Sequence, residues 1–289
     1  MPRSSYQSPY KALKLATKSN AASEATTQLL IDLVNRSLND LEGYGRETLI
    51  PVNVPGKEYF AFQRGNKMSR PVSGGLFDLE LCKEHLHDFA SGTYQRMARR
   101  SLEKFLYTLA MSFCCANDMR TSGDKKTPAT FFECFVANIF SRELGVLPTR
   151  KAEVLNLDMQ ATLPTDYLFN LGPNKAKIHL PVKISTRERV VQVWAHQRVL
   201  DGVYGVGRFQ GILVVITETN LVKGGKVTEV CLPDQWKVYQ MFISQLKRVY
   251  YLDLPIKYAK LSETYPFLQV KSFAEFFDEK DRLISAGLE

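Results

Sequence analysis

Apolar residues recur at helical spacing over much of the first 120 residues. Leucines gather on one face of a predicted helix over 24–42, which Gly43 ends. A second helix is predicted over 93–115, with basic residues outside its apolar stripe. Between the two helices, the stretch 49–62 is rich in Val, Tyr and Phe and predicts a short hairpin. The pattern therefore predicts a mainly helical N-terminal region over 1–120.

The pattern changes after the polar stretch 120–126. The nearly all-apolar segment 127–144 predicts a buried helix that begins with Thr127 as its N-cap. Two strand-like segments, 165–171 and 177–185, then flank a Gly-Pro-Asn sequence that is typical of a turn. These two segments predict an antiparallel hairpin.

A strand, a helix and a second strand follow in order. Ser185–Glu188 has the sequence of a capping box and predicts the start of a helix. The run Gly211–Ile216 is typical of a strand buried on both faces, and the order predicts a right-handed βαβ crossover. A further helix is predicted over about 233–246 and a strand over 248–254. We therefore expect an α/β core over 121–289, with a central mixed β-sheet flanked by helices.

Composition narrows the class of protein. The chain has 289 residues, of which 45% are apolar and 24% charged, as in a folded globular protein. No apolar run approaches the ~20 residues that cross a membrane, and the polar start is unlike a secretory signal. The first acid is Glu24, so an organelle transit peptide remains an alternative to a basic arm. The five cysteines form no CxxC pair, which argues against zinc and disulfides. We expect a bacterial cytoplasmic protein that binds neither membrane nor zinc.

Positive charge is concentrated in one part of the chain. The formal net charge is +8, and residues 170–210 hold seven cations against two acids, which is +5 of that total. Contacts of Lys and Arg with phosphates dominate the affinity of proteins for DNA, so this concentration predicts a nucleic-acid partner. The residues predicted to bind DNA are Lys175, Lys177, Arg187, Arg189 and Arg198.

Candidate catalytic residues lie on the predicted hairpin, Asp166 on its first strand and Lys183 on its second. With the turn centred near Pro173, Asp166 lies opposite Leu180 or Pro181, and Lys183 is about two or three residues further along. Diagonal neighbours on one face of paired strands lie about 7–8 Å apart. Two such side chains can share one phosphate and one metal ion.

These residues resemble the motif of the PD-(D/E)XK nucleases, the family that includes most type II restriction endonucleases. In that family an Asp at a strand end is followed, after a turn, by acid-x-Lys on the next strand. The match is Pro164-Thr165-Asp166 followed by Pro181-Val182-Lys183, within a similar order of elements over 127–255. The resemblance implies hydrolysis of phosphodiester bonds with Mg²⁺, which Asp166 ligates, while Lys183 positions the attacking hydroxide and stabilises the transition state.

One position departs from the family pattern. Pro181 stands where the family has its second acid, and proline offers no carboxylate. In some restriction enzymes of this family a neighbouring helix supplies the missing acid, so the resemblance implies Glu133 as catalytic acid and second metal ligand. Glu188, which the capping box also explains, and Asp158 are the alternatives. His196, on the next helix, is interpreted as structural or solvated.

The sequence therefore predicts a type II restriction endonuclease that cuts double-stranded DNA at a specific sequence, as part of a restriction-modification system. The resemblance also implies a homodimer, because two-fold protein symmetry matches a near-palindromic site. Region 1–120 is a candidate for gripping DNA or for dimer contacts. Two alternatives stay open. One is a non-catalytic DNA-binding protein on the same scaffold, which Pro181 favours, and the other is a cytosolic α/β enzyme acting on a phosphorylated small molecule.

Overall fold

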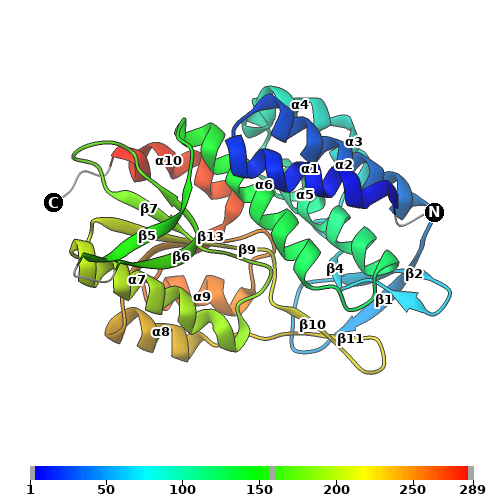
Figure 1. Ribbon diagram of the computed structural model, residues 1–289. Helices are drawn as coiled ribbons and strands as arrows, with labels where there is room; N and C mark the ends of the chain where they lie inside the picture. Colours follow the sequence, from blue (N-terminus) through cyan, green and yellow to red (C-terminus); the bar gives the residue numbers. More distant parts are fainter. Residues whose placement is uncertain (1–3, 157–159, 286–289) are drawn as a thin grey trace. The chain divides into compact units, whose positions relative to one another are not determined.

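The computed structural model describes residues 4–156 and 160–285 (Figure 1). The contacts within the chain divide it into two compact units. The first unit combines Met1–Asn138 with Glu218–Val230, and the second combines Ile139–Thr217 with Cys231–Glu289. The assignment of DNA contacts or dimer contacts to residues 1–120, and of catalysis to 121–289, stays a prediction.

Helices make up most of the first unit. The helix predicted over 24–42 is confirmed as α2, and the Ser23 side chain caps it by accepting a hydrogen bond from Thr26 N at 3.1 Å. The helix predicted from residue 93 begins later, because extended backbone at Met97 and Ala98 separates a short 3₁₀ turn from α5. The helices are α1 (Ser4–Asn20), α2 (Glu24–Glu42), α3 (Leu79–Glu84), α4 (Leu86–Ser91), η1 (Thr93–Arg96), α5 (Arg99–Arg120) and α6 (Lys126–Leu144), which continues into the second unit.

The first unit also contains a sheet, with the order β10-β11-β1-β2-β3 and β4 beside β2. The hairpin predicted over 49–62 is confirmed by the antiparallel pair β1–β2. The first unit extends beyond the predicted region 1–120, because it also takes in 121–138 and 218–230, where β11 pairs in parallel with β1, with Ile50 opposite Lys226. The strands are β1 (Gly45–Pro51), β2 (Tyr59–Arg64), β3 (Lys67–Met68), β4 (Val72–Ser73), β10 (Thr219–Val222) and β11 (Lys226–Glu229).

The sheet of the second unit has the order β13-β12-β9-β7-β6-β5, with β8 also beside β9. Strand β6 pairs antiparallel with both β5 and β7. Strands β7, β8 and β12 each pair in parallel with β9, and β13 pairs in parallel with β12, so the sheet is mixed. The predicted fold class is confirmed. The strands are β5 (Thr149–Asn156), β6 (Gln160–Phe169), β7 (Lys177–Leu180), β8 (Val182–Lys183), β9 (Phe209–Val215), β12 (Leu246–Tyr251) and β13 (Val270–Ser272).

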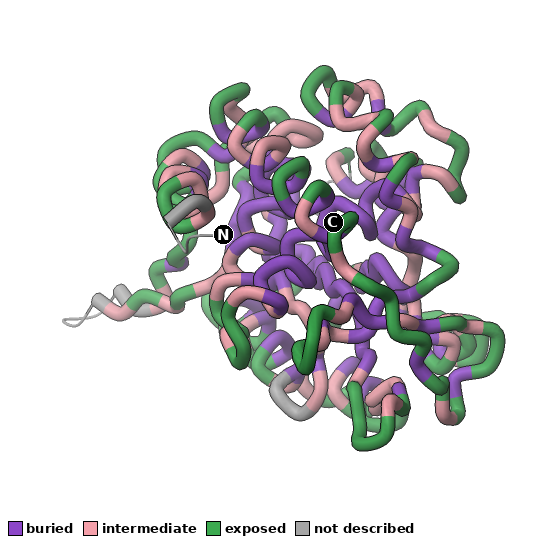
Figure 2. Tube along the Cα trace, turned by 90° about the vertical axis from the view of Figure 1, so that its right-hand side faces the viewer, coloured by how far each residue is buried: buried purple, intermediate pink, exposed green. Residues whose placement is uncertain are grey.

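Helices cover both faces of this sheet (Figure 1). Every residue of β9 is buried, as predicted for a central strand. On one face Trp194, Trp236 and Tyr258 pack together, with Trp236 and Tyr258 stacked at 4.0 Å between ring centroids. On the other face Phe140 stacks on Phe276. Figure 2 shows the buried residues along the inner segments of the trace. The helices are η2 (Arg187–Val190), α7 (Val191–Tyr204), α8 (Pro233–Phe242), α9 (Ile256–Thr264), η3 (Phe273–Glu275) and α10 (Phe276–Ser285).

Two predicted helix starts are wrong. Asp124, rather than Thr127, caps α6, because its Oδ1 accepts hydrogen bonds from the backbone N–H groups of Lys126 and Thr127. The carbonyl of Ile184 accepts from Thr217 N at 3.1 Å, which holds the chain after β8 alongside the residues that follow β9. Helix α7 therefore follows the η2 turn, and no side chain caps it. None of the described helices is long and apolar enough to cross a membrane.

Candidate active site

Asp166 and Lys183 lie together on neighbouring strands of the second unit. The register pairs Tyr167 with Leu180, and continuing it by one residue sets Asp166 opposite Pro181, one of the two predicted positions. Lys183 follows on β8, where it pairs with Val215 of β9. Its Nζ donates to Asp166 Oδ2 at 2.7 Å. The two side chains are therefore in direct contact.

Pro181 shapes this contact through the backbone. Proline has no N–H, so the β6–β7 ladder ends there, although the Pro181 carbonyl still accepts from Val214 N at 3.0 Å. The next N–H, that of Val182, donates to Asp166 Oδ2 at 2.9 Å. One carboxylate oxygen of Asp166 thus accepts from both Val182 N and Lys183 Nζ, which sets the orientation of the carboxylate.

The other oxygen of Asp166 suits a metal ion. No residue in the described part of the chain donates a hydrogen bond to Oδ1, and the side chain is 22% exposed. Mg²⁺ is usually held by one or two carboxylates together with waters and substrate phosphates. A single carboxylate with an available oxygen fits this mode. Within residues 4–156 and 160–285, no group of three His, Cys, Asp or Glu could hold a metal by itself.

The family's second catalytic acid, which Pro181 cannot supply, has three predicted candidates, and the role stays a prediction for each of them. Glu133 lies half-buried on α6, in the first unit, whereas Asp166 belongs to the second. Asp158 lies outside the described residues. The backbone of Glu188 forms part of η2, but its side chain lies outside the description.

Two histidines flank the contact of Asp166 with Lys183. His179 is buried, and burial lowers its pKa to about 4, so it is neutral at pH 7. Its ring centroid lies 6.5 Å from that of His196 on α7. Burial and the charge of Lys183 lower the pKa of His196, and the charge of Asp166 opposes them, so His196 senses both groups. His179 was not among the predicted residues, although the two-residue period of a strand places it on the face of Lys183.

A buried hydrogen-bond network fixes His179. The amide Nε2 of Gln197 donates to Asp201 Oδ1 and to the carbonyl of Phe209, each at 2.9 Å. Its Oε1 therefore accepts, and the partner at 2.9 Å is Nδ1 of His179, which must carry the proton. The network holds the face of β7 against α7 next to the candidate catalytic pair.

The five residues predicted to bind DNA are spread over a loop, a 3₁₀ turn, a strand and a helix of the second unit. On β9, the partner of Lys177 is Phe209 and the partner of Lys183 is Val215, six residues further along. That separation corresponds to about 20 Å along the strand. Lys175 lies in the loop before Lys177. Arg187 lies in η2 and Arg198 is exposed on α7, whereas the side chain of Arg189 is outside the description. A role in DNA binding stays a prediction for all five.

Comparisons with known proteins bear on the fold. No protein-family model matches the chain, and no curated protein matches it in sequence. The crystal structure of the Type IIP restriction endonuclease Kpn2I is similar over 98% of this chain and 99% of that chain, with a TM-score of 0.81 and 24% sequence identity. The structure of the restriction endonuclease PspGI with substrate DNA covers 71% of this chain and 92% of that chain, at a TM-score of 0.44 and 11% identity. From the similarity to Kpn2I we conclude that the chain has the fold of a type II restriction endonuclease, as its motif predicted.

Proposed function

We propose that the protein is a Mg²⁺-dependent endonuclease that hydrolyses phosphodiester bonds of double-stranded DNA at a specific sequence. The observation that carries the proposal is the 2.7 Å contact between the Asp166 carboxylate and the Lys183 ammonium on neighbouring strands. The similarity to Kpn2I, a restriction endonuclease, over nearly the whole chain supports it. The net charge of +8 is consistent with a polyanionic substrate.

Each residue of the contact has a role in this chemistry. Asp166 would hold Mg²⁺ through Oδ1. When bound, Mg²⁺ lowers the pKa of a coordinated water and neutralises charge on the phosphoryl oxygens. The ammonium of Lys183 stabilises negative charge that develops on the phosphate in the transition state. Val182 N–H keeps the Asp166 carboxylate oriented before substrate arrives.

The proposal includes a homodimer as the active form. A near-palindromic duplex presents the same chemical groups twice, related by two-fold symmetry. Two copies of one chain related by the same symmetry would each cut one strand. The exposed side of α7, with Arg198, is a proposed contact with the DNA backbone.

The test is cleavage of phage and plasmid DNA with Mg²⁺ or with EDTA, by the wild-type protein and by the Asp166→Ala and Lys183→Ala variants. We expect discrete fragments only with Mg²⁺, and at least about a 100-fold loss of rate in both variants, because Asp166→Ala removes the proposed metal ligand and Lys183→Ala the charge that stabilises the transition state. Lys247→Ala is the matched control, since Lys247 is exposed on β12, and it should cut like the wild type.

Intact DNA under all conditions, together with tight binding of the same DNA, would contradict the proposed catalysis. That result would favour the non-catalytic DNA-binding protein, for which the absence of a carboxylate at Pro181 is the supporting observation. Cleavage by both variants at the wild-type rate would instead place the catalytic residues elsewhere in the chain.

A further inference from the structure

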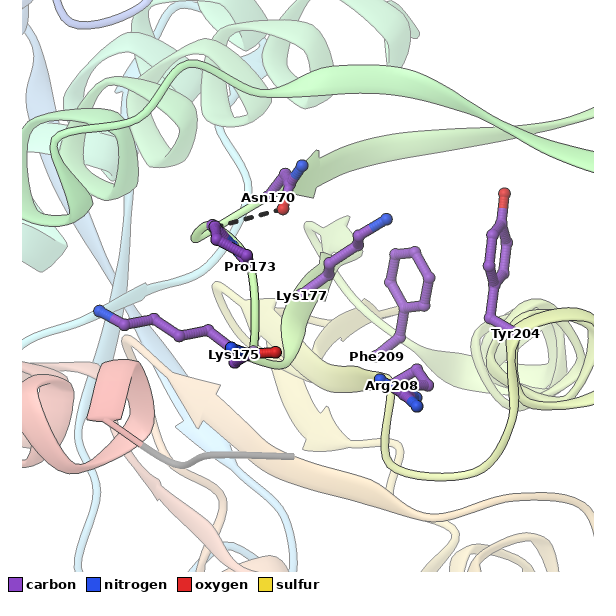
Figure 3. A pocket seen from close by; sticks show the side chains of 9 residues that line it. Asn170, Pro173, Lys175, Lys177, Tyr204, Arg208 and Phe209 are labelled. Carbon is purple, nitrogen blue, oxygen red and sulfur yellow. Dashed lines mark hydrogen bonds between the residues drawn. The ribbon is translucent and has the colours of Figure 1, made fainter. Parts of the chain in front are cut away.

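A basic hollow lies where β6 ends and β7 begins, at the opposite end of the second unit's sheet from Lys183. Its volume is about 560 Å³, and it opens between the start of β7, the start of β9 and the end of α7 (Figure 3). About 20 Å of strand separates it from Lys183. Its lining residues are Asn170, Gly172, Pro173, Asn174, Lys175, Lys177, Tyr204, Arg208 and Phe209.

Two loops build the walls of this hollow, and their own contacts hold them. Lys177 N donates to the carbonyl of Arg208 at 2.9 Å, which joins the loop before β7 to the loop before β9. Gly205 has a φ of 98°, a backbone conformation that favours glycine, where α7 ends and the chain turns toward Arg208. The hydroxyl of Tyr204 donates to the carbonyl of Glu153 at 2.6 Å, which fixes the ring at the end of α7. The walls are therefore held in place by contacts within the chain.

The charge of the hollow is uncompensated among the described residues. Three cations and no carboxylate line it, and neither Lys177 nor Arg208 forms an ion pair with a described residue. By contrast, two other partly buried cations of this unit have an acidic partner, since Arg248 and Lys271 both contact Glu279. Neighbouring cations without an acid repel each other, and a bound anion would relieve that repulsion.

Aromatic rings adjoin these cations. The Lys177 ammonium lies 5.5 Å from the ring centroids of both Tyr204 and Phe209, and the two centroids are 5.1 Å apart. Figure 3 shows the Phe209 ring between the side chains of Lys177 and Tyr204. Tyr204 is 37% exposed, so part of its ring is available to a ligand. A phosphate beside Lys177 and Arg208, with a base or sugar against Tyr204, would match both features.

We propose that this hollow is a second binding site, which takes the phosphate group of a nucleotide. The phosphate is either part of a DNA backbone or carried by a free nucleotide, and both sources offer the same chemistry. About 20 Å of strand separates the hollow from Lys183, and the four residues from Asp166 to its lining residue Asn170 span about 13 Å, so a phosphate bound there is not the one at the candidate active site. The site does not depend on the proposed cleavage, and its function would be to retain DNA or to sense nucleotide.

The test compares the Lys177→Gln/Arg208→Gln double variant with a charge-matched control, Lys223→Gln/Lys226→Gln, in EDTA so that no cleavage occurs. The control removes two exposed lysines of the β10–β11 hairpin in the first unit. Deoxyadenosine monophosphate and a duplex of about 12 base pairs, roughly 40 Å long, are the two probes. Calorimetry measures the affinity for the nucleotide, and the affinity for the duplex is measured at several salt concentrations.

If a free nucleotide is the ligand, the nucleotide should bind the wild type and the control, and the double variant should bind it at least about ten-fold more weakly. If the DNA backbone is the ligand, the dependence of log K on log salt should be shallower by about 1.8 in the double variant, since each lost phosphate contact removes about 0.9. Either result supports the site and identifies its source of phosphate.

Equal behaviour of the double variant and the control with both probes would overturn the inference. Circular dichroism checks that the variants fold, and Arg208→Gln alone, on an exposed loop, replaces the double variant if that variant unfolds. Cleavage in Mg²⁺ is scored separately. If the protein cuts DNA but the double variant binds both probes like the control, only the second site is contradicted. If the double variant and the control differ but the protein does not cut DNA, only the proposed catalysis is contradicted.

Discussion

Glu279 on α10 is a buried carboxylate that several donors surround. Its side chain is 3% exposed, and it accepts from Arg248 Nε at 2.9 Å, from Lys271 Nζ at 2.8 Å and from the Tyr250 hydroxyl. Burial raises the pKa of Glu279, but these hydrogen bonds outweigh it and lower the pKa to about 2. The carboxylate therefore links β12, β13 and α10 in its charged form.

Replacing Glu279 with Gln should reduce the free energy of unfolding by roughly 3 kcal/mol near neutral pH, since Arg248 and Lys271 lose their anionic partner. The pKa is lowered on folding, so the stabilisation is present above the ordinary value of 4.5 and is lost as the pH falls from there toward 2. Urea unfolding of both proteins over this range measures the difference. A difference that stays constant with pH would contradict the assignment.

Helix α7 packs closely on β9 at one glycine. A Cβ at Gly211 would lie 2.6 Å from Leu246 Cδ2 and 2.7 Å from Gln197 Oε1. That oxygen is the acceptor for His179, so the close approach of helix and strand also supports the network beside the candidate active site. The distance between these two elements is thus set by a residue without a side chain.

Gly211→Ala should lower the free energy of unfolding by about 1–3 kcal/mol, because the added methyl displaces Gln197 or Leu246 in a tightly packed interior. Gly202→Ala adds the same methyl on the exposed side of α7, where no atom lies within 4 Å. This control should raise stability by up to about 1 kcal/mol, since alanine favours the helix. Chemical denaturation compares the two, and an unaltered stability of Gly211→Ala would show that the interior accommodates the methyl.

The chain leaves its second unit to complete the first. Residues 218–230 supply β10 and β11, and Ile50 N donates to the carbonyl of Gly225 at 2.9 Å. Glu229, at the end of β11, accepts from Lys57 Nζ at 2.7 Å and from the Tyr59 hydroxyl at 3.1 Å. The first unit is therefore built from two distant segments of sequence.

A fragment of residues 1–144 lacks β10 and β11, which leaves β1 at an open edge of the sheet. We therefore expect this fragment to unfold without a cooperative transition. Adding 218–230 through a flexible linker should restore a cooperative transition, because β11 can again pair with β1. Thermal unfolding followed by circular dichroism compares the two fragments with the whole chain. Cooperative unfolding of 1–144 by itself would mean that the β10–β11 hairpin is dispensable.

Local patterns were sufficient for the elements whose residues interact over short distances in sequence. The leucine spacing of α2, the apolar run of β9 and the hairpin that joins β6 to β7 were all predicted, because periodicity and turn residues act within a few positions. The same hairpin brought Asp166 and Lys183 together. The motif and the order of elements around it were therefore enough to predict the type II restriction endonuclease fold.

Features that join distant positions, or that depend on backbone hydrogen bonds between segments, could not be predicted from the local sequence. Nothing in the local sequence pairs Ile50 with Lys226, because strand pairing leaves no periodic signal in either partner. The start of α7 depended on whether Ile184 bonds to the neighbouring strand. The basic hollow forms where two loops and the end of α7 meet, at the opposite end of the sheet from Lys183. The number of charges in residues 170–210 does not show that these cations lie in two separate places.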